Sequence, residues 1–366
     1  MEHYKRIVIK IGSSSLTNSR GLLDQSRMMA LAGAIAELFL RGWQPVLVSS
    51  GAVAAGLGQL GWSRSNLTMP ERQAAASVGQ GLLMEKYNEL FLARGIQVGQ
   101  VLLTKEDLAD RRRYLNARNT LNVLLNRRVL PIVNENDTVA FAEIRFGDND
   151  TLSALVAGLV EAELLIILTD IDGLYSGDPR KDPTARLIPV VRQVDESIEQ
   201  AAGGSGTPVG TGGMRTKLAA ARIAARSGLR AVVASGKDPA VILSLAAGEA
   251  VGTCFEPSPH SLRSRKQWIA FGSVARGTLT IDRGAVKALM EGNKSLLAVG
   301  VTGVRGNFPA SSVVVVEDDR GVELARGITN LSSDDLRLVI KNPGRGLEVI
   351  NRDWLVCERS FSTCQS

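Results

Sequence analysis

Short apolar runs alternate with longer helical patterns along the first 255 residues of the chain. The apolar runs, rich in β-branched residues, lie at residues 6–12, 44–49, 96–104, 129–133, 164–170 and 230–235. Helical spacing of apolar residues extends over residues 22–42, 74–95, 114–128, 151–163 and 216–228. Apolar strands that alternate with helices are typical of a parallel sheet that is buried on both faces. The pattern therefore predicts an α/β fold with a parallel-rich sheet sandwiched by helices.

Polar or glycine-rich corners follow several of these predicted strands. They are residues 10–13, 49–51, 134–137 and 169–170. In a parallel sheet the carboxyl ends of the strands meet at one edge, and ligands bind beyond that edge. We therefore expect these corners to come together in space, although they are scattered in sequence.

The pattern changes after Glu256. Residues 257–267 contain two prolines and a basic cluster, which is typical of a linker. Beyond it, short strands with turn residues are interrupted by two short helical patterns, at residues 284–292 and 332–340. The sequence thus predicts an α/β domain over residues 1–256, a linker over 257–267 and a small β-barrel domain over 268–366.

A glycine-rich segment, residues 210–217, precedes the last helical pattern of the first domain. Its glycines let the backbone approach a bulky anion, and a helix N-terminus offers that anion free N–H groups and a positive dipole end. Lys217 adds a full charge one turn into the helix. The segment suits a polyphosphate, although its spacing is not that of a P-loop. The alternative is a glycine-rich linker whose helix is capped by Thr211 or Thr216.

Two lysines and one aspartate form the candidate catalytic group. Lys10 sits in an apolar strand and Lys217 in an apolar helix, and burying a lone ammonium group is costly. A carboxylate between them would hold both ammonium groups toward a transferring phosphoryl group, and Asp150 is the candidate. The alternative is that Asp148 or Asp150 only caps the helix that begins near residue 150.

Histidine is missing between His3 and His260. A kinase that acts on an alcohol needs a base near the hydroxyl group. A kinase that acts on a carboxylate needs none, because a carboxyl group with a pKa of ~4.3 is already ionised at neutral pH. The charge that such a reaction brings together can be neutralised by lysines, backbone N–H groups and Mg²⁺. The missing base therefore favours a carboxylate as the phosphoryl acceptor.

Composition excludes several other classes. The net charge is +6, and the three cysteines and two histidines have no metal-ligand spacing, which argues against a zinc site. The longest apolar run, residues 152–170, carries Glu161 and Glu163 and does not suit a membrane span. The first 12 residues are too charged for a signal peptide. We expect a cytoplasmic protein with reduced thiols.

Several of these segments carry a resemblance to a known family. They are residues 8–16 (VIKIGSSSL), 49–56 (SSGAVAAG), 115–121 (LNARNTL), 131–139 (PIVNENDTV), 147–157 (GDNDTLSALVA), 168–180 (LTDIDGLYSGDPR) and 210–221 (GTGGMRTKLAAA). In this order and spacing they resemble the glutamate 5-kinase family of the amino acid kinase superfamily. Residues 277–289, 300–308 and 321–336 resemble a PUA domain, a small β-barrel found in RNA-modifying enzymes.

The resemblance implies an activity: ATP-dependent phosphorylation of the side-chain carboxylate of L-glutamate to L-glutamyl 5-phosphate, the first step of proline biosynthesis. It implies that Lys10 and Lys217 stabilise the transferring phosphoryl group and that Asp150 orients them. Ser50, Asp137 and Asn149 match glutamate-contacting positions, with Asn134 and Asp148 close beside them. The nucleotide site would comprise Lys10, Thr169, Asp170, Thr211, Gly212, Gly213, Met214, Arg215, Thr216 and Lys217.

The resemblance also implies partners. Mg²⁺ would enter with ATP, proline would act as a feedback inhibitor, and the enzyme would form a homo-oligomer, a dimer or a tetramer, through its kinase domains. RNA binding by the PUA-like domain is the alternative function. Leu331 stands where that domain usually has an aromatic residue, and no aromatic stacking platform is evident, so the sequence favours the kinase.

Overall fold

The computed structural model describes residues 5–18, 22–140, 149–179, 182–202, 213–258, 269, 275–292, 294–341 and 346–357. The chain divides into two compact units. The first comprises residues 1–107 and 112–261, and the second comprises residues 108–111 and 262–366.

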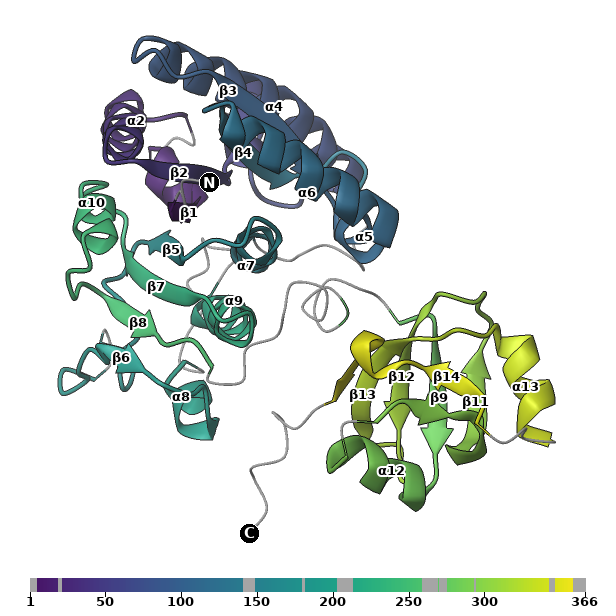
Figure 1. Ribbon diagram of the computed structural model, residues 1–366. Coiled ribbons are helices and arrows are strands. Elements are labelled where there is room, and N and C mark those ends of the chain that lie inside the picture. Colours follow the sequence, from purple (N-terminus) through teal and green to yellow (C-terminus); the bar gives the residue numbers. More distant parts are fainter. Residues whose placement is uncertain are drawn as a thin grey trace. The chain divides into compact units, whose positions relative to one another are not determined.

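A mostly parallel sheet forms the centre of the first unit (Figure 1). Within the described ranges it has eight strands in the order β3-β4-β2-β1-β5-β7-β8-β6. They are β1 (Lys5–Ile11), β2 (Trp43–Ser49), β3 (Val98–Leu103), β4 (Leu130–Glu135), β5 (Leu164–Thr169), β6 (Val190–Val191), β7 (Arg230–Ser235) and β8 (Thr253–Phe255). Only the β7–β8 pairing is antiparallel among these neighbours. The predicted α/β class with a parallel-rich sheet is confirmed.

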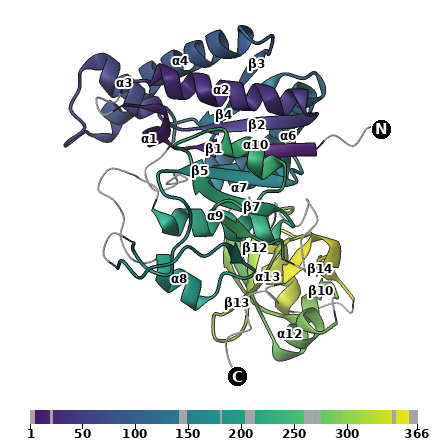
Figure 2. The same cartoon turned by 90° about the vertical axis from the view of Figure 1, so that its left-hand side faces the viewer.

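Helices cover both faces of this sheet (Figure 2). The helices α2 (Gln25–Leu40), α4 (Met69–Leu92) and α10 (Val241–Ala246) lie on one side, and α7 (Asn149–Leu159) and α9 (Met214–Arg226) lie on the other. The remaining helices of the unit are α1 (Ser13–Leu16), α3 (Ala52–Leu60), α5 (Lys105–Ala109), α6 (Arg111–Asn126) and α8 (Glu196–Ala202). The short helix α3, directly after a strand corner, had no signal in the hydrophobic pattern.

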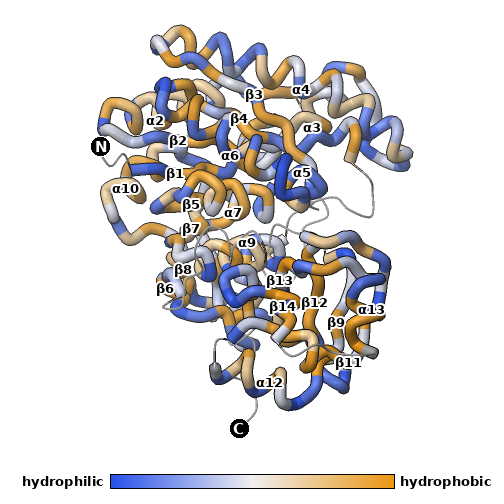
Figure 3. Tube along the Cα trace, turned by 45° about the vertical axis from the view of Figure 1, so that its right-hand side comes forward, coloured by the Kyte–Doolittle hydropathy of each residue, from blue (hydrophilic) through white to orange (hydrophobic). Residues whose placement is uncertain are grey.

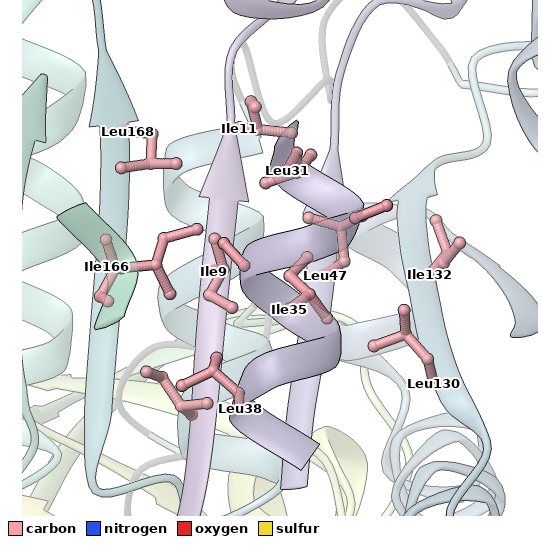
Figure 4. Packing of buried hydrophobic residues seen from close by; sticks show 14 of the residues in the cluster. Ile9, Ile11, Leu31, Ile35, Leu38, Leu47, Leu130, Ile132, Ile166 and Leu168 are labelled. Carbon is pink, nitrogen blue, oxygen red and sulfur yellow. The ribbon is translucent and has the colours of Figure 1, made fainter. Parts of the chain in front are cut away.

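The alternation of side chains along β1 decides which residues face which layer. Ile9 and Ile11 are fully buried in the cluster that β1 forms with α2, where they pack near Leu31 and Ile35 (Figure 4). Lys10, between the two isoleucines, therefore points to the opposite face, where α7 lies. Strand β1 thus delivers the charged side chain of Lys10 to the α7 side of the sheet.

Helices α2 and α4, on the same side of the sheet, each begin at a side-chain cap. The Asp24 carboxylate accepts hydrogen bonds from the backbone N–H groups of Ser26 and Arg27 at the start of α2. At the start of α4, the Glu71 carboxylate accepts from the backbone N–H group of Thr68. Such caps satisfy donors that have no partner within the helix.

Helices α3 and α4 cross in very close contact. A Cβ atom at Gly79 of α4 would lie 1.8 Å from the carbonyl oxygen of Ala52, and one at Gly56 of α3 would lie 1.8 Å from that of Ala75. Because both obstacles are backbone atoms, only glycine fits at these two positions. The crossing holds α4 against the beginning of α3, which follows directly on the corner after β2.

The second unit contains a smaller sheet whose apolar strands stand out in the hydropathy colouring (Figure 3). Its described strands run in the order β11-β9-β12-β13-β15: β11 (Val301–Gly306), β9 (Gly277–Ile281), β12 (Val313–Glu317), β13 (Glu323–Ile328) and β15 (Leu355–Cys357). A two-stranded pair, β10 (Leu296–Leu297) and β14 (Glu348–Ile350), and the helices α12 (Arg283–Met290) and α13 (Ser333–Lys341) accompany it. The predicted small β-rich second domain is confirmed. Leu331 packs against its core.

None of the helices in the described ranges is long and apolar enough to cross a membrane.

Candidate active site

The candidate site lies at the carboxyl edge of the large sheet. The strands β1, β2, β4 and β5 are mutually parallel neighbours, so their carboxyl ends meet at one edge. Three of the predicted corners follow these ends directly: Ser50 after β2, Asp137 shortly after β4, and Asp170 after β5. Helix α7 lies against the same strands and places its first residues beside them.

Lys10, Asp150 and Lys217 form a buried group of charges. The Nζ atom of Lys10 lies 2.6 Å from Oδ1 of Asp150, and the Nζ atom of Lys217 lies 3.1 Å from Oδ2 of the same carboxylate. Asp150 is fully buried, and the two lysines are 4% and 5% exposed. The three residues come from β1, α7 and α9. One carboxylate therefore holds two ammonium groups near each other in a buried environment, where electrostatic interactions are strong.

Asp150 is not the cap that the sequence offered as an alternative. Helix α7 begins at Asn149, so Asp150 already lies within its first turn, and its carboxylate binds the two lysines. The other capping candidate, Asp148, lies outside the described residues.

The start of α9 differs from the capping that the sequence suggested. Gly213 is the residue that precedes the helix, and Thr216 lies inside it. The Thr216 hydroxyl group is within hydrogen-bond distance of Asp150 Oδ2 (2.9 Å) and of the Gly213 carbonyl oxygen (2.8 Å). Thr216 thus adds a second contact from α9 to the central carboxylate. Met214 is half-buried and Arg215 is exposed, whereas Thr211 and Gly212 lie outside the described residues.

A network of amide groups continues from this charged group. The Nδ2 atom of Asn149 donates to the carbonyl oxygen of Ser49 (2.8 Å), to Oγ of Ser50 (3.0 Å) and to Oδ1 of Asn134 (2.8 Å). The NH₂ group of Asn149 has only two hydrogens for these three oxygen atoms. The Ser50 hydroxyl group therefore remains able to form a hydrogen bond with another partner. Three of the predicted substrate residues, from β4, α7 and the corner after β2, are therefore in direct contact.

Two residues of α4 join this network, and the sequence analysis missed both. The Asn134 amide donates to Oε1 of Gln80 (2.7 Å), and the buried hydroxyl groups of Tyr87 and Ser49 lie 2.9 Å apart. Burial raises the pKa of Tyr87, which keeps its hydroxyl group neutral. Gln80 and Tyr87 lie seven residues apart, and that spacing puts both on one face of the helix. The apolar pattern of α4 gave no sign that these two polar groups turn inward.

Other predicted residues also lie near this edge of the sheet. Thr169 ends β5, is buried, and its hydroxyl group donates to the Asp170 carboxylate at 3.0 Å. Asp137 is half-buried in the turn after β4. Among the described residues, no group of three or more histidine, cysteine, aspartate or glutamate side chains is arranged to hold a metal ion.

Sequence comparisons show which families the chain resembles. The amino acid kinase family matches residues 5–235, and the PUA domain matches residues 277–350. Glutamate 5-kinase of Trichlorobacter lovleyi is 47% identical and covers 97% of this chain and 97% of its own length. Those of Nitrosospira multiformis (49% identical, 97% of this chain and 98% of that protein) and Chromobacterium violaceum (51%, 94% and 92%) are similar over nearly the whole chain as well.

The fold also matches a solved structure. Carbamate kinase from Giardia lamblia bound to AMP-PNP has a TM-score of 0.53 to this chain at 17% identity, covering 70% of this chain and all of that one. At that identity the likeness concerns the fold alone. The full-length similarity to the curated relatives is decisive, and the chain belongs to the amino acid kinase family and, within it, to the glutamate 5-kinases.

Proposed function

We propose that this protein transfers the γ-phosphoryl group of ATP to the side-chain carboxylate of L-glutamate, giving L-glutamyl 5-phosphate and ADP. The observation that carries the proposal is the buried group in which Asp150 holds Lys10 and Lys217, directly beside the amide network of Asn149. The relatives of this chain supply the identity of the acceptor. The product is the activated carboxylate that opens proline biosynthesis.

The chemistry needs charge neutralisation more than proton transfer. A carboxylate oxygen of glutamate attacks the γ-phosphorus atom, and the bond from that phosphorus to the bridging oxygen of ADP breaks. The attacking group is already ionised at neutral pH and gives up no proton. Its approach to a triphosphate is opposed by like charge, which two buried ammonium groups offset. Lys10 and Lys217 take this role, and Asp150 positions them.

The amide network would bind the other end of the substrate. Asn149 is the neighbour of Asp150, so the network begins beside the reacting centre and leads away from it. We assign Ser50, Asn134 and Asn149 to glutamate, with Asp137 as the partner of its α-ammonium group, because a carboxylate is the simplest means of selecting a cationic group. We also assign Asp148 to the glutamate site, on the basis of the sequence alone.

The nucleotide would lie on the other side of the central carboxylate. Thr169 ends β5, the strand next to β1, and Asp170 follows it; the segment from Thr211 to Lys217 includes the first turn of α9. Lysine side chains and helix N–H groups suit phosphate oxygens. Mg²⁺ would enter with ATP and add charge neutralisation.

Regulation and assembly are proposed from family membership. We expect proline to inhibit by competing for the glutamate site, because it shares the α-carboxylate and the ammonium group of glutamate. We also expect a homo-oligomer, a dimer or a tetramer, working in the cytoplasm. RNA binding by the PUA domain is a separate possibility that does not bear on the reaction.

One coupled assay tests the main proposal. ADP release is followed while hydroxylamine traps any acyl phosphate, with glutamate, aspartate, N-acetylglutamate and UMP offered separately. We expect only glutamate to give both ADP and a hydroxamate. A higher rate with one of the other three acceptors would show that the acceptor has been assigned wrongly.

A further inference from the structure

Three amide side chains are hydrogen-bonded in a row, and the polar atom at each end of the row has no hydrogen-bond partner in the described part of the chain. Asn149 donates to Asn134, and Asn134 donates to Gln80. The Oδ1 atom of Asn149, at one end, and the Nε2 atom of Gln80, at the other, are buried and lack a hydrogen-bond partner among the described residues. A buried polar atom without a partner is unfavourable, so each end calls for an explanation.

Two backbone groups beside the row fix the orientation of the Asn149 and Asn134 amide groups. The carbonyl oxygen of Ser49 can only accept, so the atom of Asn149 that lies 2.8 Å from it must be the NH₂ group. The backbone N–H group of Glu135 can only donate, so the atom of Asn134 that receives it must be the oxygen. These two anchors define the direction of every hydrogen bond along the row.

The free ends then have defined characters. Because the Asn134 oxygen faces Asn149 and the backbone of Glu135, its NH₂ group faces Gln80 and requires an acceptor there. Gln80 supplies Oε1, which leaves Nε2 as a free donor. At the opposite end, the Oδ1 atom of Asn149 is a free acceptor. The row presents one donor and one acceptor to its surroundings.

The position of Gln80 is set by its helix. The preceding residue, Gly79, packs directly against the backbone of Ala52 and Gly56, where no side chain fits. Tyr87, two turns further along the same face of α4, contacts Ser49. Gln80 is therefore held at the substrate corner by two neighbouring contacts of its own helix, and its side chain is half-buried.

We propose that Gln80 is a further substrate-binding residue, whose Nε2 group donates a hydrogen bond to the α-carboxylate of glutamate. This inference rests on the function proposed above. The reacting carboxylate lies at Lys10, Lys217 and Asp150, next to Asn149, whereas Gln80 lies at the far end of the row, two hydrogen bonds further on. The far end suits the α-groups of the substrate. A donor there matches the α-carboxylate.

Two substitutions separate substrate binding from support of Asn134. Gln80→Leu removes both the donor and the acceptor of the side chain. Gln80→Glu keeps an acceptor for Asn134 and removes the donor. Asn88→Leu replaces an exposed amide of the same helix and controls for the loss of an amide in α4. For each variant, kcat, the KM for glutamate, the KM for ATP and the thermal midpoint are measured in the full-length enzyme.

We expect the KM for glutamate to rise about tenfold or more in both Gln80 variants, the effect of losing one hydrogen bond to a charged group. The KM for ATP should stay unchanged, and Asn88→Leu should behave like the wild type. Inhibition by 4-aminobutyrate, which lacks the α-carboxylate, should be equally strong in the wild type and in Gln80→Leu.

Three outcomes would overturn the assignment. An unchanged KM for glutamate in Gln80→Leu would show that Nε2 does not meet the substrate. A normal KM for glutamate in Gln80→Glu would show that Gln80 only positions Asn134. Weaker inhibition by 4-aminobutyrate in Gln80→Leu than in the wild type would show the same. A wild-type enzyme that fails to phosphorylate glutamate would instead refute the proposed function, so the two failures are distinguishable.

Discussion

The ammonium group of Lys10 lies 2.6 Å from the carboxylate of Asp150, in a pair that is almost completely buried. Lys10 reaches this position because it occupies the α7 side of β1, where the residues next to it, Ile9 and Ile11, are apolar and face the α2 cluster. Asp150 reaches it because α7 begins one residue earlier, at Asn149. A second lysine, Lys217, contacts the remaining oxygen of the same carboxylate. Two buried ammonium groups are a strong source of charge stabilisation for a reacting phosphoryl group.

The two lysines should act mainly on the chemical step. Lys10→Ala or Lys217→Ala should lower kcat by about 10²- to 10³-fold, the order lost when one preorganised charge-stabilising group is removed. The double variant should lose less than the product of the two effects, because both residues act on one phosphoryl group. Steady-state kinetics of the three variants checks this. Strictly multiplicative losses, or a change confined to the KM for ATP, would mean that the lysines only bind nucleotide.

Asp150 should matter for stability as well as for activity. Asp150→Ala leaves two buried ammonium groups without the carboxylate that joins them, and breaking a buried ion pair in this way costs about 3 kcal/mol or more. Urea unfolding measures the loss. The control is Arg41→Ala, which breaks an exposed pair with Glu37 and should change the free energy of unfolding by less than ~1 kcal/mol. Similar losses in both variants would contradict a special role for the buried pair.

The hydrophobic pattern and the charges predicted much of this site, for identifiable reasons. An isolated lysine in an apolar strand is visible without a structure, and so is a lysine behind a glycine-rich corner. The contact between Thr216 and Asp150 was not visible, because it depends on where α9 begins. Gln80 was missed because its partner is 54 positions away in sequence, and because the close crossing of α3 and α4 at Gly79 is a contact between backbones. Contacts of that kind are set by packing, which local sequence does not encode.

Substrate residues should separate from nucleotide residues in kinetics. Asn149→Ala removes a donor to three oxygen atoms of the glutamate corner, and it should raise the KM for glutamate well above any change in the KM for ATP. Asp137→Asn keeps the shape of the side chain and removes its charge, so it should have the same selective effect if its partner is the substrate's α-ammonium group. Both constants are measured at saturating levels of the other substrate. An unchanged KM for glutamate in Asp137→Asn would place the ammonium contact on another residue.

The crossing of α3 and α4 should tolerate no side chain. In Gly79→Ala the new Cβ atom would lie 1.8 Å from the Ala52 carbonyl oxygen and 2.4 Å from the Gly56 nitrogen, both backbone atoms. The helices would have to separate, which should destabilise the protein by about 3 kcal/mol or more. The matched control is Gly81→Ala, two residues further along α4, where a Cβ atom meets nothing within 4 Å. There alanine should be neutral or stabilise by up to ~1 kcal/mol. Equal behaviour of the two variants in thermal unfolding would show that the crossing can relax.

The first unit should work without the second. Every residue assigned to the reaction lies before residue 218, and the last described backbone contacts of the unit are those of β8 with β7 and of the Ser258 N–H group with the carbonyl oxygen of Ala225. A chain that ends at Ser258 keeps these contacts and should fold, with glutamate-dependent ATP turnover within about an order of magnitude of the full chain. Circular dichroism and the hydroxylamine assay check folding and turnover separately. Well-folded shortened protein without turnover would make the PUA domain part of the catalytic machinery, because the shortened chain retains Lys10, Asp150, Lys217 and the complete amide row.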